Sequence, residues 1–338
     1  MSIDGAPVRW GVLGTARIFE RRMAPAFAAA RNAELIAIAS RSEEKAAASA
    51  QRHGIPRAFG SYDTLLADDE VEAVYIPLPN DQHREWTLRA LEAGKHVLCD
   101  KPAALTYADA ALMSDTAAAK NLRLMEGFMW RHHPQHARIR EIIEGGELGT
   151  IVHFRGAFTY PAVRDRNNIR WQAAGGGAFW DVGVYPVNAA RFHFGGEPVA
   201  VQAVARRDDE TGIDLHTVGI LEWAEGRTAS FVCGFDQAFA STYTVIGDRG
   251  SVTAERGFQI GESGVDLTIR IGDSEIRTEH FPHLLQYARE IEDFSACIRD
   301  VSLSLTPGED GRAQAAVTEA LARAARERRT VEISEITG

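Results

Sequence analysis

Cysteine is scarce in this chain. Only three occur among the 338 residues, at Cys99, Cys233 and Cys297, and none forms a CxxC pair. An odd number of widely spaced cysteines does not provide a disulfide framework, and it is typical of a reducing compartment. We therefore expect the three side chains to be reduced and buried, and we expect the protein to work in the cytoplasm.

Long apolar runs are also missing. No stretch approaches the ~20 apolar residues that a membrane-spanning helix needs. The first ten residues, MSIDGAPVRW, lack a basic start followed by an apolar segment, so we expect no secretory signal there. There is no internal repeat, and alanine-rich stretches are the only biased segments.

Positive charge is in deficit. The chain has 37 Lys and Arg against 47 Asp and Glu, which gives a formal net charge of −10. A protein that binds a nucleic acid backbone needs a basic face to displace counterions. We therefore expect neither a nucleic acid nor a membrane partner, although a local basic pocket for one nucleotide is compatible with this balance.

The first 125 residues alternate short apolar runs with longer alanine-rich amphipathic stretches. The apolar runs cover residues 8–13, 33–40, 71–78, 94–99 and 122–127. The amphipathic stretches cover residues 18–30, 43–53, 81–93 and 106–119. Near-continuous apolar strands separated by helices are typical of a parallel sheet covered on both faces. We predict an α/β domain over residues 1–125, a doubly wound Rossmann sheet that binds ligands at the carboxyl ends of its strands.

From residue 150 the pattern changes to alternating strands, after an amphipathic stretch at 131–144. The strand patterns cover residues 151–160, 199–207, 216–223, 227–235, 241–247 and 250–255. Helical patterns cover residues 178–192, 283–299 and 310–328. We predict an α+β domain over residues 126–338 on a large, mostly antiparallel, open-faced sheet, whose terminal helices can pack back on the first domain. An open sheet face favours burial between subunits, so we expect a homodimer or homotetramer through this sheet.

The turn after the first predicted strand reads GVLGTARIF. Only Gly14 matches the G-x-G-x-x-G pattern of dinucleotide sites, because Ala16 and Phe19 occupy the later glycine positions. The fragment alone also fits an ordinary tight turn, but the turn opens the first β–α unit, as a pyrophosphate site requires. We expect this part of the cofactor site to be formed by Gly14, Thr15, Ala16, Arg17 and Ile18.

An acidic residue is absent at the end of the second predicted strand. An NAD site places Asp or Glu there to bind the ribose 2′-hydroxyl. This chain has Ser40 and Arg41 instead, with Lys45 one turn further on. A hydroxyl and a guanidinium suit a 2′-phosphate. We therefore expect NADP as the cofactor, with NAD as the alternative; the competing interpretation is that Arg41 is a solvated loop charge.

Two more loops follow predicted strands. In PLPNDQH, residues 77–83, two prolines rigidify the strand exit and Asn80 can cap the following helix. In CDKPAALT, residues 99–106, Lys101 emerges at the carboxyl edge of the sheet, where cofactors bind. A lone histidine near a helix start is more often structural than ligand-binding. The cofactor contacts that we expect from these loops are Leu78, Pro79, Asn80, His83, Asp100 and Lys101.

Three glycines at residues 175–177 precede an acid, a phenol and an amide. Asp181, Tyr185 and Asn188 have i, i+4, i+7 spacing, so a helix that begins near residue 178 places them on one stripe. The glycines then permit a close backbone approach to a ligand. The structural alternative is an ordinary loop before a capped helix, with Tyr185 as a packed residue.

Other catalytic patterns are missing. There is no Ser-His-Asp or GxSxG pattern. His132 and His136 have a spacing that can bind zinc, but Pro134 intervenes and no acidic base stands at the usual place. We therefore expect no metal.

Six motifs occur in a fixed order: GTARI, SRS, YIPLPNDQH, DKP, EGFMWRHHPQ and GGGAFWDVGVYPVN. In this order the chain resembles the Gfo/Idh/MocA oxidoreductases over nearly its whole length. It is most similar to the branch of NADP-dependent D-xylose dehydrogenases and dimeric dihydrodiol dehydrogenase. Two departures are visible: Asp100 stands where the family motif has Glu, and Pro186 stands where many relatives have Cys.

The resemblance implies a hydride transfer between NADP and a carbinol carbon of a sugar, polyol or vicinal diol. It implies that Lys101 touches the nicotinamide and a substrate hydroxyl, and that Tyr185 transfers the proton. A phenol has a pKa near ~10, which a neighbouring ammonium lowers. We expect Asp181 to hold a substrate hydroxyl, with a role as the base in place of Tyr185 as the alternative. Further contacts are expected from Arg131 for the cofactor and from Arg170, Trp171 and Tyr287 for the substrate.

Two other functions stay open. Members of the resembled family include a non-catalytic dinucleotide-binding regulator, but such a protein has no need of the proton relay of Lys101 and Tyr185. Others are glycosidases with a tightly bound NAD, for which an acidic residue near position 40 is expected. The identity of the substrate and the physiological direction do not follow from the sequence.

Overall fold

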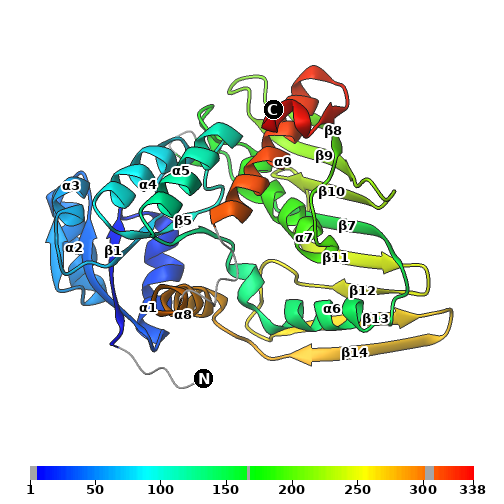
Figure 1. The fold of residues 1–338 in the computed structure, drawn as a ribbon, viewed down its shortest axis with the longest axis horizontal. Helices are drawn as coiled ribbons and strands as arrows, with labels where there is room; N and C mark the ends of the chain where they lie inside the picture. The colour runs from blue at the N-terminus through cyan, green and yellow to red at the C-terminus, as the bar shows by residue number, and fades with distance from the viewer. Residues whose placement is uncertain (1–5, 166–167, 301–307) are drawn as a thin grey trace. The chain divides into compact units, whose positions relative to one another are not determined.

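The computed structural model describes residues 6–165, 168–300 and 308–338, which form two compact units. The first unit contains the described residues up to His132 and those from Leu285 to Arg312. The second unit contains those from His133 to Leu284 and from Ala313 to Gly338. Figure 1 shows the elements of both units.

Among the described residues, the first unit holds one parallel sheet of six strands. Its strands are β1 (Val8–Leu13), β2 (Ala33–Ala39), β3 (Arg57–Phe59), β4 (Ala73–Ile76), β5 (His96–Asp100) and β6 (Leu124–Gly127). The spatial order is β3-β2-β1-β4-β5-β6, and every neighbouring pair is parallel. The order reverses between β1 and β4, which opens a crevice at the carboxyl ends of these strands. The predicted Rossmann sheet is confirmed.

Helices cover both faces of this sheet. They are α1 (Ala24–Ala29), α2 (Glu43–His53), α3 (Tyr62–Leu66), α4 (His83–Glu92), α5 (Tyr107–Ala119) and α8 (Gln286–Arg299). The core of one face centres on Trp10, whose ring contacts Phe27 of α1 and Phe294 of α8 at centroid distances of 5.3 and 5.6 Å. The indole N–H donates to Ser295 Oγ at 3.1 Å. Helix α8 is therefore part of the first unit although it lies late in the sequence.

The sequence analysis left residues 54–70 without an assignment. They contain β3 and α3, which have three and five residues. A helix of five residues has fewer than two turns, and a strand of three residues has fewer than two repeats of the two-residue alternation. Neither is long enough to show a periodic pattern of apolar residues in the sequence. The helix expected at 18–30 also differs, because it opens with a π-helical turn at Phe19–Met23 before α1 begins.

Among the described residues, the second unit holds a sheet of nine strands. They are β7 (Ile151–Thr159), β8 (Ala200–Arg207), β9 (Asp214–Glu222), β10 (Thr228–Gly234), β11 (Ala240–Gly247), β12 (Gly250–Ala254), β13 (Val265–Ile271), β14 (Glu275–Phe281) and β15 (Val331–Glu332). The order is β14-β13-β12-β11-β7-β10-β9-β8-β15, and only β7 and β10 pair in parallel. The predicted large, mostly antiparallel sheet is confirmed. The sequence analysis missed its last three strands: β14 exposes most of its residues and β15 is very short.

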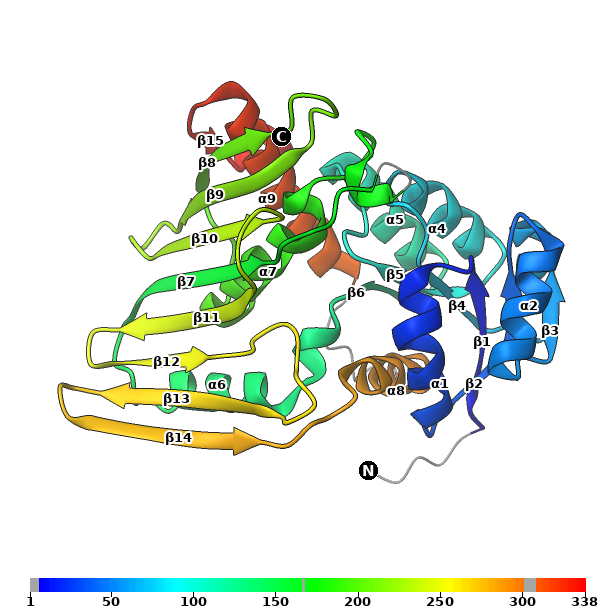
Figure 2. The same ribbon diagram turned by 180° about the vertical axis from the view of Figure 1, so that it is seen from behind.

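Helices cover one face of this sheet (Figure 2). They are α6 (Pro134–Glu144), α7 (Val184–Phe194) and α9 (Gly308–Glu327), and a short α10 (Ser334–Thr337) follows β15. Helix α7 lies close to β7, because a Cβ built on Gly156 would stand 2.8 Å from Pro186 Cβ. On the other face, Val204, Val218 and Val232 form one cross-strand row over β8, β9 and β10. Val204 is 62% exposed and Val218 is 48% exposed, so this row lies open to solvent.

Buried histidines in both units predict a loss of stability in mild acid. Burial lowers the pKa of His133 and the pKa of His96 to about 4. In the unfolded chain a histidine has a pKa near ~6.5. Between these values the unfolded chain binds protons that the folded chain does not, so the free energy of unfolding falls as the pH drops from about 6.5 towards 4.

Urea unfolding at a series of pH values measures this slope. We expect the H133N variant, which removes one titrating group, to show a smaller fall over that range than the unmodified protein. Parallel pH profiles for the two proteins would show that protonation of His133 does not control the fall.

Candidate active site

The loop after β1 requires glycine at its first position. Gly14 has φ 111°, and a Cβ there would stand 3.0 Å from Leu78 Cδ2. Its N–H donates to Ala39 O at 2.8 Å, which ties the loop to the end of β2. The chain then turns into a helix, since Glu20 N donates to Ala16 O. The predicted cofactor loop therefore ends at a helix N-terminus, where unpaired N–H groups favour an anion; Thr15 and Ile18 are half-buried there and Arg17 is exposed.

The end of β2 places a cation beside this loop. Arg41 is exposed, and its side chain hydrogen-bonds the hydroxyl of Tyr62. That hydroxyl lies 3.7 Å from the Cβ position of Gly14. Burial raises the pKa of Tyr62 and Arg41 lowers it in part, with a net rise. Tyr62 thus brings Arg41 and Gly14 together, a role that the sequence analysis missed because the segment around it carried no assignment.

Ser40 and Lys45 lie next to Arg41. Ser40 is buried, and its Oγ accepts a hydrogen bond from Ser42 N at 3.3 Å. Ser42 in turn caps α2, because its Oγ accepts from Lys45 N at 3.3 Å. The Lys45 side chain is exposed on the first turn of α2. The end of β2 therefore presents two exposed cations, Arg41 and Lys45.

The exits of β4 and β5 meet through His83. The ring is 1% exposed, and its Nδ1 and Nε2 lie 2.8 Å from Pro102 O and Leu78 O respectively. Pro79 and Asn80 continue the loop after Leu78 into a short 3₁₀ turn. The structure therefore places His83 on the chain's own backbone, which is the structural alternative raised in the sequence analysis.

The Asp100-Lys101 pair stands at the end of β5. Asp100 Oδ1 accepts from Lys101 N at 2.9 Å, and Asp100 Oδ2 accepts from the Tyr75 hydroxyl at 3.3 Å. Lys101 is half-buried at the carboxyl edge of the sheet. The carboxylate of Asp100 therefore fixes the backbone where the lysine leaves the strand.

Arg131 and Tyr287 also lie in the first unit. The Arg131 side chain is 5% exposed and pairs with Asp310 at 3.0 Å. Tyr287, on the first turn of α8, is half-buried against the apolar core around Trp10. Both side chains thus have protein partners that the motif order did not indicate.

In the second unit, the glycines before α7 serve close packing. A Cβ on Gly176 would stand 2.3 Å from Gln172 O. Gly177 has φ 109°, and a Cβ there would stand 2.1 Å from Asp214 Oδ1. Asp214 Oδ2 accepts from Phe179 N at 2.8 Å and so holds the start of the helix. The close packing against the chain's own backbone and Asp214 explains glycine at positions 176 and 177, and an approach of these glycines to a ligand stays a prediction.

Asp181 lies on a π-helical turn at Phe179–Gly183, directly before α7. Its Oδ2 accepts from the Tyr160 hydroxyl at 2.6 Å and from Arg170 Nε at 2.7 Å. Asp181 raises the pKa of Arg170, with smaller contributions from Tyr160 and Tyr185, so the guanidinium stays charged. Burial and the Asp181 charge raise the pKa of Tyr160, which therefore stays a neutral donor. The ion-paired carboxylate is suited to accept hydrogen bonds from a bound hydroxyl.

Tyr185 follows on the first turn of α7 and is 6% exposed. Its ring contacts Phe158 and Phe258 at centroid distances of 5.2 and 5.7 Å. One turn later, Asn188 is buried and its Nδ2 donates to Gln314 Oε1 of α9 at 3.2 Å. Asn188 thus has a structural partner on α9.

Trp171, expected beside the substrate with Arg170, is 7% exposed. Its ring lies 5.8 Å from that of Phe235, and the Arg164 guanidinium lies over it. The first residue of the NNIRW motif, Asn167, lies outside the described residues. Trp171 is therefore packed into the loop, whereas Arg170 reaches Asp181.

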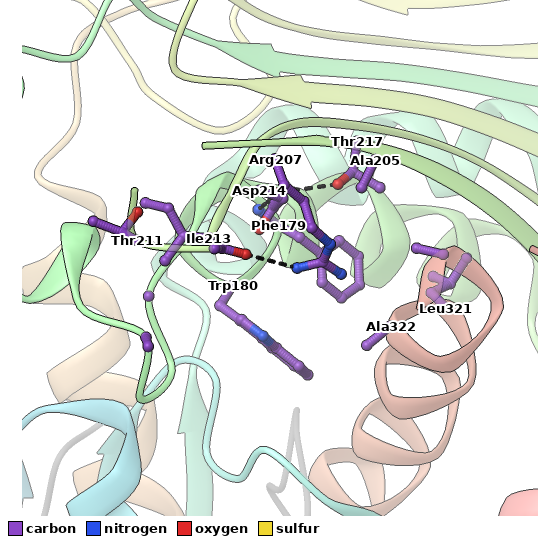
Figure 3. Close-up of a pocket in the computed structure, with 14 residues that line it drawn as sticks. Phe179, Trp180, Ala205, Arg207, Thr211, Ile213, Asp214, Thr217, Leu321 and Ala322 are labelled. Atoms are coloured by element: carbon purple, nitrogen blue, oxygen red, sulfur yellow. Dashed lines mark hydrogen bonds between the residues drawn. The ribbon is translucent and has the colours of Figure 1, made fainter. Parts of the chain in front are cut away.

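A cavity of about 320 Å³ adjoins the glycine loop in the second unit. Figure 3 shows Trp180 along its open side, with Arg207 and the α9 residues Leu321 and Ala322 around it. Arg207 Nη1 donates to Gly212 O at 3.0 Å. No sequence pattern pointed to this cavity, because its walls come from four separate segments.

Within the described residues, no group of three or more His, Cys, Asp and Glu side chains could hold a metal ion. His132 Nδ1 lies 2.6 Å from Asp293 Oδ2, and His136 Nδ1 lies 2.6 Å from the Tyr243 hydroxyl. Every helix in the described part of the chain is too short or too polar to span a bilayer.

Two family models match the chain. Residues 8–128 match "Oxidoreductase family, NAD-binding Rossmann fold", and residues 136–253 match "GFO/IDH/MocA C-terminal domain". Together they cover more than half of the sequence.

Relatives match over most of their length. D-xylose 1-dehydrogenase (NADP(+)) 2 of Haloferax volcanii is 37% identical over 290 residues, which are 86% of this chain and 88% of that protein. A dTDP-3,4-didehydro-2,6-dideoxy-alpha-D-glucose 3-reductase of Saccharopolyspora spinosa is 35% identical over 328 residues, 95% of this chain and 98% of that protein. The crystal structure of KijD10, a 3-ketoreductase from Actinomadura kijaniata in complex with NADP and TDP-benzene, has a TM-score of 0.88 and 34% identity. It covers 94% of this chain and 98% of its own.

These matches confirm the resemblance that the order of the six motifs predicted. They run through both units and include the loops after the strands of the first unit. The chain belongs to the Gfo/Idh/MocA family of oxidoreductases.

Proposed function

We propose that the chain is an NADP-dependent oxidoreductase that acts on a carbinol carbon of a sugar, polyol or vicinal diol. The observation that carries the proposal is the cluster in the second unit, where an ion-paired Asp181 lies four residues before Tyr185 and is hydrogen-bonded to Tyr160. Such a cluster combines acceptors for a substrate hydroxyl with a phenol that can exchange its proton. The relatives named above are a sugar dehydrogenase and nucleotide-sugar reductases, which supports this substrate class.

The loops of the first unit fit NADP. The positive φ of Gly14 and the close contact with Leu78 leave no room for a side chain where a pyrophosphate approaches the helix. Arg41 and Lys45 present two exposed cations at the end of β2, which suits a 2′-phosphate. We propose that the residues of the cofactor site are Gly14, Thr15, Ala16, Arg17, Ile18, Ser40, Arg41, Lys45, Leu78, Pro79, Asn80, Asp100, Lys101 and Arg131, whereas the ring nitrogens of the buried His83 contact the backbone of the two loops. When bound, NADP supplies the hydride acceptor.

In the oxidation direction, Tyr185 takes the proton of the substrate hydroxyl while the same carbon loses a hydride, which leaves a carbonyl group. A phenol is a poor base at neutral pH, and a nearby cation favours the phenolate. We assign this role to Lys101, and Arg170 contributes positive charge on the side of the second unit. We assign Asp181 to a second hydroxyl of the substrate, and Arg170, Trp171 and Tyr287 to further substrate contacts. In the reverse direction Tyr185 donates the proton.

We propose that residues 1–125 serve as the dinucleotide-binding domain and residues 126–338 as the substrate-binding and dimerisation domain. The open row of Val204, Val218 and Val232 supports a homodimer or homotetramer through the nine-stranded sheet. Sparse, buried and free cysteines support function in the cytoplasm.

The Y185F variant tests the proposed function. With aldoses, polyols, diols and dTDP-linked keto sugars as substrates, we expect turnover to fall by ~10²–10⁴ on whichever substrate is active. Cofactor affinity should stay near that of the unmodified enzyme. The matched control is Y160F, which removes a phenol bonded to Asp181 and should cost less turnover. Full turnover by Y185F would refute the role of Tyr185, and inactivity of the unmodified enzyme on all these substrates would refute the substrate class.

The R41A variant tests the cofactor. Removal of the guanidinium should weaken NADP binding by ~10-fold or more while NAD binding changes little, because only NADP carries the 2′-phosphate. Arg52, which lies on α2 and pairs with Glu20, provides the control variant R52A. Fluorescence titration with both reduced cofactors measures the effect, and equal losses for the two cofactors would contradict the assignment.

The V218R variant tests the assembly. A guanidinium in the middle of the exposed valine row should split the dimer, because a buried unpaired charge is strongly unfavourable. Sedimentation velocity should then show monomers, whereas E225A, in the turn between β9 and β10, should sediment like the unmodified protein. An unchanged sedimentation coefficient for V218R would exclude this face as the interface.

A further inference from the structure

The backbone turn that carries Lys101 is held by side chains from two other elements. Pro102 O lies 2.8 Å from Nδ1 of His83, which begins α4. Ala103 N donates to Oε1 of Glu126, on β6, at 2.9 Å. Both side chains are buried, with exposed fractions of 1% and 4%. The Pro102 C=O and the Ala103 N–H belong to one peptide group, so His83 and Glu126 both contact the peptide that joins Pro102 to Ala103.

His83 joins two loops. Its second ring nitrogen lies 2.8 Å from Leu78 O, so one rigid ring spans the exits of β4 and β5. A neutral imidazole has one N–H and donates to one of these carbonyl oxygens at a time, whereas a protonated ring donates to both. The position of the lysine turn is thereby set against the loop that also touches Gly14.

Glu126 reaches the turn from the neighbouring strand. In the β5–β6 register it stands opposite Cys99, two residues before Lys101. Its side chain extends beyond the end of β5 and accepts the Ala103 N–H, which would otherwise be buried without a partner. A buried N–H that loses its acceptor is costly, so this bond strongly favours one conformation of the turn.

We propose that His83 and Glu126 are positioning residues for the reaction: together they fix the turn that presents the Lys101 ammonium. This inference rests on the proposed role of Lys101. A catalytic group must be held within about 0.5 Å of its working position, and small displacements cost large factors in rate. Neither residue needs to touch the substrate for this role.

The variants H83L and E126L remove the two polar contacts, and the leucine side chain fills most of the space that the buried histidine or glutamate occupied. We expect each to lower kcat by ~10–100-fold, with an unchanged substrate profile. E126Q keeps a carbonyl oxygen for Ala103 N–H and should recover most of the activity. H96L is the matched control, because His96 Nδ1 accepts Arg123 N at 2.9 Å at the opposite end of β5. It should lower stability and leave kcat unchanged.

A double-mutant cycle with K101A separates positioning from a merely structural role. If His83 and Glu126 act through Lys101, single-turnover rates of H83L/K101A and E126L/K101A should equal that of K101A alone. Multiplied losses would overturn the inference. Wild-type turnover by K101A would instead refute the proposed function, so the two failures are distinguishable.

Amide hydrogen exchange gives a readout that does not depend on activity. E126L should speed exchange at Ala103 relative to the unmodified protein, whereas H96L should leave that amide protected. Unchanged protection at Ala103 in E126L would show that Glu126 does not hold the turn, and this result would overturn the inference even if kcat fell.

Discussion

The reversal of strand order between β1 and β4 is the constraint on which the first unit depends. From β1 the chain adds β2 and β3 on one side of the sheet, and it then adds β4, β5 and β6 on the other side. The loops that follow β1 and β4 therefore diverge and leave a crevice between them. Each loop that meets there has a specific anchor. Gly14 is tied to Ala39, Arg41 to Tyr62, and the turn after Lys101 to His83 and Glu126. The polar groups at this edge are therefore fixed by backbone geometry and buried side chains.

A π-helical turn follows a glycine-containing loop in each unit, at Phe19–Met23 in the first and at Phe179–Gly183 in the second. Such turns are rare in proteins overall, and those that do occur are frequently found at functional sites. In the second unit the π turn carries Asp181 and stands directly before Tyr185. Asp214 anchors its first N–H and occupies the space that a side chain at position 177 would need.

Much of the fold follows from the sequence. Apolar runs and amphipathic stretches predicted the Rossmann sheet and five of its six strands, because long periodic elements carry a strong signal. Elements β3, α3 and β15 were missed, since two to five residues show no period. The order of the six motifs, several of which lie in loops that follow strands, indicated the family.

The detail of the site could be predicted only in part. Spacing indicated Asp181 and Tyr185, but it could not show that Asp181 pairs with Arg170 and Tyr160, because those partners come from distant segments. The three glycines pointed to a ligand, but spacing could not show that Gly177 packs against Asp214, 37 positions later in the chain, or that Gly176 packs against the carbonyl oxygen of Gln172. The contacts of Tyr62 with Arg41 and of Glu126 with Ala103 join residues far apart in the sequence, so no local sequence pattern could predict them.

The account assigns one proton relay to two residues that lie in different units. A crystal structure with NADP and a substrate analogue measures this most directly. The account predicts that Lys101 Nζ and Tyr185 Oη both lie within about 3 Å of the same substrate hydroxyl, next to the nicotinamide ring. A complex in which the Tyr185 hydroxyl points into the core, away from a correctly bound nicotinamide, would contradict it.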